Sequence, residues 1–316
     1  MALTINTNLS SQIVQANLAK STNQLNQAIE RMTTGYKINH ASDNAAGYSI
    51  ARNWDTQLGS LDIAADNAAT GADMLSTLED HYQLVSSHVQ RVRDLTEQAA
   101  NGTYGEQSLK AIKSEIVARL EEIDRIAANC EFSGQYMMNG SMSDINIQVG
   151  TDGNADKSQI VLADKLFEKG DVASLFVSDA KTVNGQNIAA YNLKTAVTAK
   201  GSFSSVDAAR RDKLASDCAG LTDGTTPASM LTYIDDVINK ISDRVTTLGA
   251  AQNRIESAIE SIGVQSENIM SSLSTLRDAD VAKESSNYIK AQILQQASAT
   301  LLATANQTPS IALNLL

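Results

Sequence analysis

The fold is decided by residues 231–276, which read LTYIDDVINKISDRVTTLGAAQNRIESAIESIGVQSENIMSSLSTL. Large aliphatic side chains recur every seven residues along this stretch, at Ile234, Ile241, Leu248, Ile255, Ile262, Ile269 and Leu276. A second aliphatic position accompanies them in most heptads, with Gln252 as a polar exception. This pattern predicts one long helix that packs against other long helices as in a coiled coil.

The first half of the chain carries three more helical patterns. The longest runs to about Ala100, with apolar residues every seven positions from Trp54 to Val89. We expect this helix to begin after Ser42 or Asp43, because both residue types are good N-caps. A shorter helix is expected over residues 109–127. The first helix carries a thin apolar seam at Val14, Leu18, Leu25, Ala28 and Met32. We expect a break after it, over residues 33–43.

The middle and the end of the chain differ from these patterns. Residues 129–180 contain alternating apolar positions at 145–149, turn dipeptides and the run Ile160-Val161-Leu162, which predict a β-hairpin region. Residues 180–226 have weak periodicity and are interpreted as a short variable insert. Beyond Asp280, apolar residues at four-residue spacing predict a last helix that Pro309 stops. The expected fold class is mainly α, a coiled-coil-like helical rod with paired terminal helices, a small β-hairpin region and a short insert.

Composition excludes several classes of protein. The net charge of −11 argues against nucleic acid as a partner, and no apolar run is long enough for a membrane span. Cys130 and Cys218 are interpreted as isolated thiols rather than as a disulfide or a zinc pair. No phosphate loop, nucleophile elbow or metal-binding histidine pair occurs, so we expect no enzyme activity, metal or cofactor.

Charge is depleted at both ends of the chain. Residues 1–42 and 281–316 hold only seven charged side chains and sum to +3, whereas the middle sums to −14. The apolar side chains of the C-terminal segment are too few to offset the entropy cost of ordering it alone. We therefore expect terminal segments that are disordered in the free chain and ordered by self-assembly. The residues expected to carry assembly are Leu18, Leu25, Met32, Ile289, Ile293 and Leu301.

Several motifs then identify a resemblance. The segment AIERMTTGYKIN at residues 28–39, followed by SDNAAG at 42–47, resembles the N-terminal signature of bacterial flagellins. The segments LGAAQNRI at 248–255, LRDAD at 276–280 and KAQILQQA at 290–297 resemble the family's C-terminal motifs. The resemblance covers roughly residues 1–140 and 227–316.

The resemblance implies a subunit of the flagellar filament, secreted by the flagellar type III pathway without a cleaved signal and located outside the cell. It implies a terminal domain of residues 1–43 with 278–316, a helical domain of 44–179 with 227–277, and a short variable insert of 180–226 between the two segments of the helical domain. The implied partners are other copies of the chain, an export chaperone, the filament cap and the hook–filament junction proteins. A hook–filament junction protein of the same architecture is the alternative.

The resemblance also implies recognition by the flagellin-sensing Toll-like receptor of a host. The segment QRVRDL at residues 90–95 and the segment IKSEI at 112–116 resemble the receptor-binding surface of flagellins. The residues carried over are Gln90, Arg91, Leu95 and Glu115. Arg91 and Leu95 are four residues apart and are expected on one helix face, outside the core seam. Ordinary solvent or subunit contacts remain the alternative role for these side chains.

Overall fold

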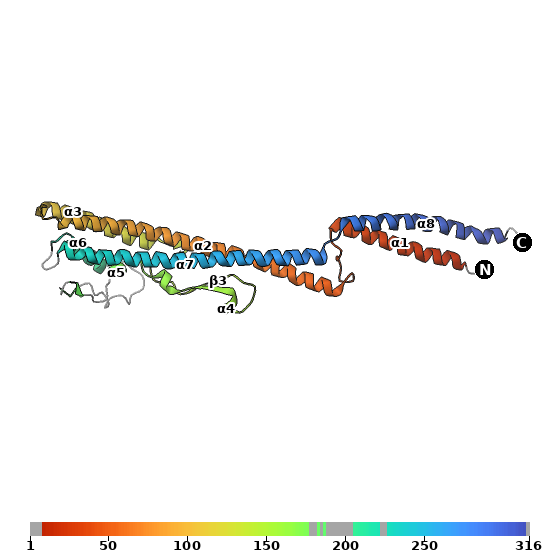
Figure 1. The fold of residues 1–316 in the computed structure, drawn as a ribbon, viewed down its shortest axis with the longest axis horizontal. Helices are drawn as coiled ribbons and strands as arrows, with labels where there is room; N and C mark the ends of the chain where they lie inside the picture. Colours follow the sequence, from red (N-terminus) through yellow and green to blue (C-terminus); the bar gives the residue numbers. More distant parts are fainter. Residues whose placement is uncertain (1–7, 177–181, 184–185, 188–204, 222–225, 314–316) are drawn as a thin grey trace. The chain divides into compact units, whose positions relative to one another are not determined.

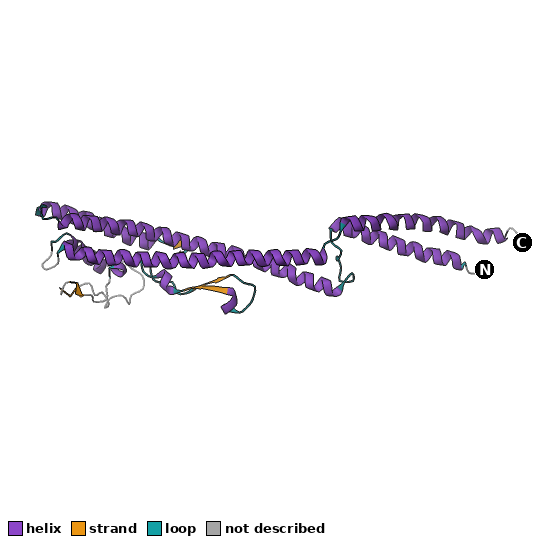
Figure 2. Cartoon of the chain, in the orientation of Figure 1, coloured by secondary structure: helices purple, strands orange, loops and turns teal. Residues whose placement is uncertain are grey.

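The chain is mainly helical, as the heptad patterns predict (Figures 1 and 2). A computed structural model describes residues 8–176, 182–183, 186–187, 205–221 and 226–313. The chain divides into two compact units, one of Met1–Ser60 with Val264–Leu316 and the other of Leu61–Gly263. Two long helices contribute to both units, α2 over Ala45–Ala100 and α7 over Pro227–Arg277.

In the first unit, α1 (Leu9–Thr34) and α8 (Val281–Leu313) lie side by side and antiparallel (Figure 1). The Asn8 side chain caps α1 by accepting a hydrogen bond from the Ser11 N–H at 3.1 Å. Gly35 ends α1 with a positive φ of 75°, a backbone conformation that glycine adopts without strain. Asp280 caps α8, because its carboxylate accepts from the N–H groups of Ala282 and Lys283.

The start of α2 lies slightly later than predicted. The N-cap is Asn44, whose side-chain oxygen accepts from the Gly47 N–H at 3.0 Å, so the assignment to Ser42 or Asp43 is wrong. Asp43 is engaged instead in the preceding turn, where its carboxylate accepts from the N–H groups of His40 and Asn39. The His40 N–H is the main cause that lowers the pKa of Asp43, with burial acting against it.

Pro309 does not stop the last helix, which continues to Leu313 and corrects the prediction. A proline inside a helix cannot donate to the carbonyl four residues earlier, here that of Ala305. The side-chain amide of Asn8 donates to the Ala305 oxygen at 2.7 Å. A residue at the opposite end of the chain thus supplies the hydrogen bond that Pro309 lacks, and this contact is invisible to sequence periodicity.

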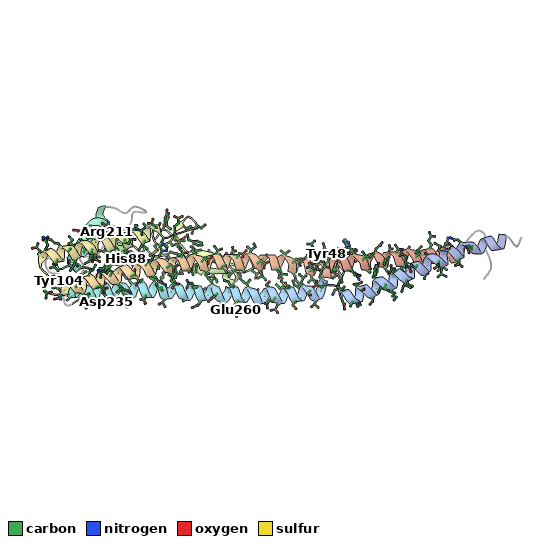
Figure 3. The ribbon with its side chains drawn as sticks, turned by 90° about the horizontal axis from the view of Figure 1, so that it is seen from above. Tyr48, His88, Tyr104, Arg211, Asp235 and Glu260 are labelled. Atoms are coloured by element: carbon green, nitrogen blue, oxygen red, sulfur yellow. The ribbon has the colours of Figure 1, made fainter. Side chains whose placement is uncertain are left out.

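In the second unit, α2 and α7 pack with α3 (Glu106–Asn129) around one apolar core. The heptad positions predicted from Ala68 to Val89 on α2 and from Ile234 to Ile255 on α7 occupy it, and Leu75, Tyr82, Val89 and Ile234 are fully buried. Figure 3 shows Tyr104, in the turn after α2, at the same end of this unit as Asp235 of α7. Asp235 pairs there with Arg93 of α2 at 2.6 Å.

The predicted β-hairpin forms from β3 (Ile145–Gln148) and β4 (Gln159–Leu162), which pair antiparallel with Ile147 opposite Ile160. The Ile147 side chain packs so closely on α2 that a Cβ at Gly71 would lie 2.3 Å from its Cδ1. A smaller hairpin, β1 (Glu131–Phe132) with β2 (Gln135–Tyr136), precedes it. The short elements that complete this region are α4 (Ala155–Ser158), η1 (Asp164–Phe167), α5 (Val172–Leu175), β5 (Thr182–Val183) and β6 (Gln186–Asn187).

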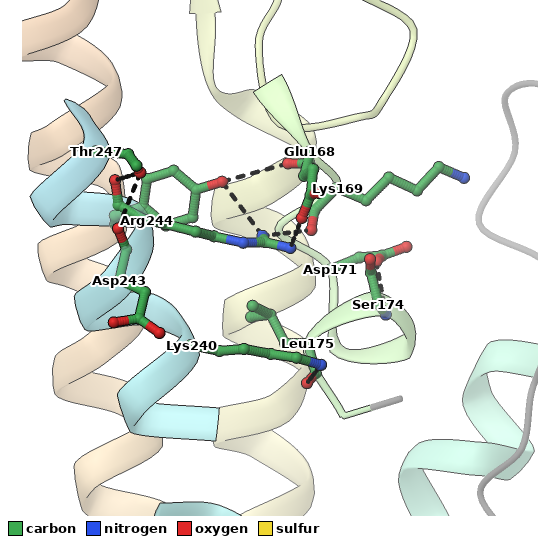
Figure 4. Close-up of polar contacts among 10 residues, drawn as sticks. Glu168, Lys169, Asp171, Ser174, Leu175, Lys240, Asp243, Arg244 and Thr247 are labelled. Carbon is green, nitrogen blue, oxygen red and sulfur yellow. Dashed lines mark hydrogen bonds and ion pairs between the residues drawn. The ribbon is translucent and has the colours of Figure 1, made fainter. Parts of the chain in front are cut away.

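Arg244 of α7 fastens the segment after β4 to the helices (Figure 4). Its guanidinium donates to the Lys169 carbonyl at 2.8 Å and the Tyr82 hydroxyl at 3.3 Å, and pairs with the Glu168 carboxylate at 2.6 Å. The Tyr82 hydroxyl in turn donates to the Glu168 carbonyl. One side chain therefore joins α2, α7 and the hairpin region.

The chain also forms a helix where the sequence analysis assigned only an insert, α6 over Ser205–Cys218. Arg211 of α6 (labelled in Figure 3) pairs with Asp124 of α3 at 3.2 Å, and the other oxygen of Asp124 accepts from the Val172 N–H. Cys218 ends α6 as a buried thiol, and Cys130 is a second one. Both are free, as predicted, and burial raises the pKa of each to about 12.

Candidate assembly interface

The contact between α1 and α8 is built from small side chains. Ser21 and Ala28 of α1 and Ala291 and Ser298 of α8 are each less than 10% exposed. Small residues at seven-residue spacing let two helix backbones approach closely, but they bury little apolar area. Val14, Leu18 and Leu25 lie on the same face of α1 and are half-buried, so the pair is closed by small side chains together with partly buried aliphatic ones.

Polar contacts run along this pair from end to end. Ser11 donates to Asn306 at 2.8 Å, Gln295 donates to Thr22 at 3.2 Å, and Arg31 pairs with Glu284 at 3.4 Å. With the contact between Asn8 and Ala305, they match the two helices in a single antiparallel register. Glu284 is 8% exposed, and a shift in register would leave its carboxylate buried without its cation.

Several large apolar side chains of α1 and α8 lie on the outside of the pair. Ile289, Ile293 and Leu301 of α8 are 52%, 59% and 57% exposed. Met32 of α1 is also exposed, whereas Leu18 and Leu25 are half-buried. Five further exposed residues, which were not predicted from the sequence, also lie there: Leu9, Ile13, Ile29, Val281 and Leu294.

These exposed side chains form what we call the outer apolar surface: Leu9, Ile13, Ile29, Met32, Val281, Ile289, Ile293, Leu294 and Leu301. Exposed large apolar side chains in this number on two helices are typical of a protein–protein interface. Few charges interrupt it, since α8 carries only Lys283, Glu284 and Lys290. The arrangement is suited to burial by other apolar helices.

The four residues carried over for receptor binding do not lie on one surface. Gln90 is exposed on α2, and the guanidinium of Arg91 donates to the Glu115 carboxylate of α3 at 2.8 and 3.0 Å. Leu95 is only 2% exposed and belongs to the core. Its expected position outside the core seam is wrong, because α2 buries Val92, Leu95, Thr96 and Ala99 on a wide face rather than along one narrow seam.

The described residues contain no group of three metal-ligating side chains, and their histidines have local roles. His40 pairs with Glu30 at 2.8 Å, and a ring nitrogen of His81 lies 2.8 Å from the Thr77 carbonyl. Within the same ranges, the helices lack a stretch with the length and hydropathy of a membrane span.

Comparison with known proteins agrees with this architecture. Residues 5–143 match the bacterial flagellin N-terminal helical region, and residues 231–316 match the bacterial flagellin C-terminal helical region. Polar flagellin F of Vibrio parahaemolyticus is 28% identical, with both chains covered over their full length. A flagellin of Halalkalibacterium halodurans is 30% identical, with 99% of each chain covered.

Among solved structures, a putative flagellar hook-associated protein from Vibrio parahaemolyticus has a similar fold. Its TM-score is 0.55 at 14% identity, covering 75% of this chain and 100% of that one. The two family matches cover more than half of the chain and include α1, α2, α3, α8 and α7 from residue 231 onward. The chain therefore belongs to the bacterial flagellin family.

Proposed function

We propose that this flagellin polymerises by burying the outer apolar surface of α1 and α8 against the same surface of neighbouring copies. As a flagellin, the chain is a structural subunit of the flagellar filament. The observation that supports the proposal is that different side chains of the terminal pair are buried within it and exposed outside it. Small side chains such as Ala28 and Ala291 close the pair, while Ile289, Ile293 and Leu301 remain exposed.

The layers of the filament follow from this proposal. Residues 1–43 with 278–316 form the inner tube, residues 44–179 with 227–277 surround it, and residues 180–226 lie farthest out. The subunit is exported through the flagellar type III pathway with the help of a chaperone, and it is added beneath the cap beyond the hook–filament junction proteins. This placement makes the protein extracellular and structural, with no catalytic role.

A test is seeded growth of purified protein. Filaments are dissociated by heat, cooled, mixed with short seeds and followed by electron microscopy. We expect filaments that lengthen as long as subunits remain, with a growth rate proportional to subunit concentration. A junction protein of the same architecture would stop at a short, fixed length, and absence of any growth would refute polymerisation.

We also propose a reduced receptor surface of Gln90, Arg91 and Glu115 for the flagellin-sensing Toll-like receptor. The support is the exposure of Gln90 and the Arg91–Glu115 pair, which places both charged groups at the surface of α2 and α3. In a receptor-reporter assay on monomer, Arg91→Ala is expected to lower potency. The matched control is Arg125→Ala, which removes another exposed arginine paired with Glu122. Equal potency of both variants and wild type would refute this surface.

A further inference from the structure

Two short links connect the terminal helices to the long helices of the first unit. Residues 35–44 join α1 to α2, and residues 278–280 join α7 to α8. The links are hydrogen-bonded to each other across an antiparallel bridge between Tyr36 and Asp278. The Lys37 N–H donates to the Arg277 carbonyl at 2.7 Å, and the Ala279 N–H donates to the Gly35 carbonyl at 2.8 Å. The end of α1 and the start of α8 thus meet at one backbone junction.

The side chain of Arg277 holds this junction together. Its guanidinium donates to both oxygens of the Asp55 carboxylate, at 2.8 and 3.1 Å. The guanidinium carbon lies 4.1 Å from the centre of the Tyr36 ring. We call Arg277, Tyr36 and Asp55 the link clamp, because they join the end of α7, the first link and the first part of α2.

The link clamp differs from an ordinary surface ion pair. The Arg277 side chain is 22% exposed, and its Nε is buried without an acceptor among the described residues. Arginine is suited to this position because its planar guanidinium can meet a carboxylate at its edge and stack on an aromatic ring with its face. A lysine could satisfy only one of these contacts at a time.

The position of the link clamp decides what it can influence. α7 ends at Arg277 itself and α8 begins at Val281, so three residues separate the clamp from the last helix. α1 ends at Thr34, two residues before Tyr36. Since α1 and α8 pair from this junction onward, the junction sets the geometry in which their outer apolar surface is formed.

We propose that Arg277 is a positioning residue for polymerisation, which holds the two links in the arrangement from which α1 and α8 pair. The inference rests on the proposed polymerisation through these helices. Loss of the clamp leaves the core of the second unit intact, because no residue of the clamp belongs to it. Loss of the clamp should instead weaken assembly, and we expect about a tenfold rise in the critical concentration, equivalent to about 1.4 kcal/mol.

The test compares four variants of the full chain in seeded growth: Arg277→Gln, Tyr36→Leu, Tyr36→Phe and Arg254→Gln. Arg277→Gln and Tyr36→Leu each remove one half of the stacked contact and should raise the critical concentration. Tyr36→Phe keeps the aromatic ring and should behave as wild type. Arg254→Gln removes an exposed arginine from the same helix and serves as the matched control.

Two measurements separate positioning from simple loss of stability. Thermal unfolding followed by circular dichroism should be unchanged for the main transition in all variants. Emission of Trp54, the single tryptophan and the neighbour of Asp55, should shift in Arg277→Gln monomers. Wild-type critical concentration for both Arg277→Gln and Tyr36→Leu would overturn the inference, as would equal defects in Tyr36→Leu and Tyr36→Phe. Failure of wild type to grow would instead overturn the proposed function.

Discussion

Replacing Ile293 by aspartate tests the proposed polymerising surface most sharply. Ile293 lies on α8 and is 59% exposed in the single chain. An aspartate there can remain in water in the monomer, so the substitution should change the stability of the free chain little. In the filament, the same position is proposed to be buried against neighbouring copies.

The magnitude follows from the exposed fraction. Full burial of an isoleucine side chain stabilises by about 1.5–3 kcal/mol, so the 59% that is still exposed leaves about 1–2 kcal/mol to be gained on assembly. A carboxylate buried without a partner adds a penalty of several kcal/mol. A total of about 4 kcal/mol or more corresponds to roughly a thousandfold increase in the critical concentration.

The assay is sedimentation of seeded reactions over a range of subunit concentrations. Ile293→Asp should leave all protein in the supernatant at concentrations where wild type forms filaments, and Ile293→Ala should show only the apolar loss of about tenfold. Gln296→Glu adds the same charge at an exposed polar position on α8 and serves as the control. Filaments of Ile293→Asp at the wild-type critical concentration would refute burial of this surface.

Three other predictions concern the second unit. Leu95→Ala should lower the free energy of unfolding by about 2–5 kcal/mol, because the side chain is 2% exposed; unchanged denaturant unfolding would contradict its place in the core. Burial, with Arg119, lowers the pKa of His88, so native His88 resists protonation and stability should fall as the pH drops below about 6.5. His88→Gln should lose less stability than wild type between pH 7 and pH 5, as measured by melting temperature. An equal fall in melting temperature for both proteins would refute this role of His88. Burial raises the pKa of the Cys130 and Cys218 thiols to about 12, so both should resist alkylation in the native protein at pH 8. Rapid labelling of either thiol, measured by mass spectrometry, would contradict this prediction.

The heptad patterns predicted the long helices because a repeat of apolar residues every seven positions marks the helix face that must be buried. Ile234, Ile241 and Leu248 lie in the core, and the hairpin of β3 and β4 forms where alternating apolar residues indicated it. The fold class and the family could therefore be predicted from the sequence. The layered division into domains concerns the assembled filament and stays a prediction.

Other features depend on contacts between distant residues and could not be predicted. Helix α6 has weak periodicity of its own and is tied to α3 by the pair of Arg211 with Asp124. Leu95 was misplaced because spacing on one helix does not reveal how many neighbours surround it. The sequence did contain a signal for the closing face of the terminal pair, since the buried Ala291 and Ser298 are seven residues apart.

Hydrogen exchange of dilute monomer and of filament can show whether neighbouring copies stabilise the terminal helices. We expect amides of α1 and α8 to exchange rapidly in the monomer, while those of α2, α3 and α7 in the second unit are protected. In the filament, protection should extend through α1 and α8. Strong protection of both terminal helices in the dilute monomer, equal to that in the filament, would contradict the claim that neighbouring copies stabilise them.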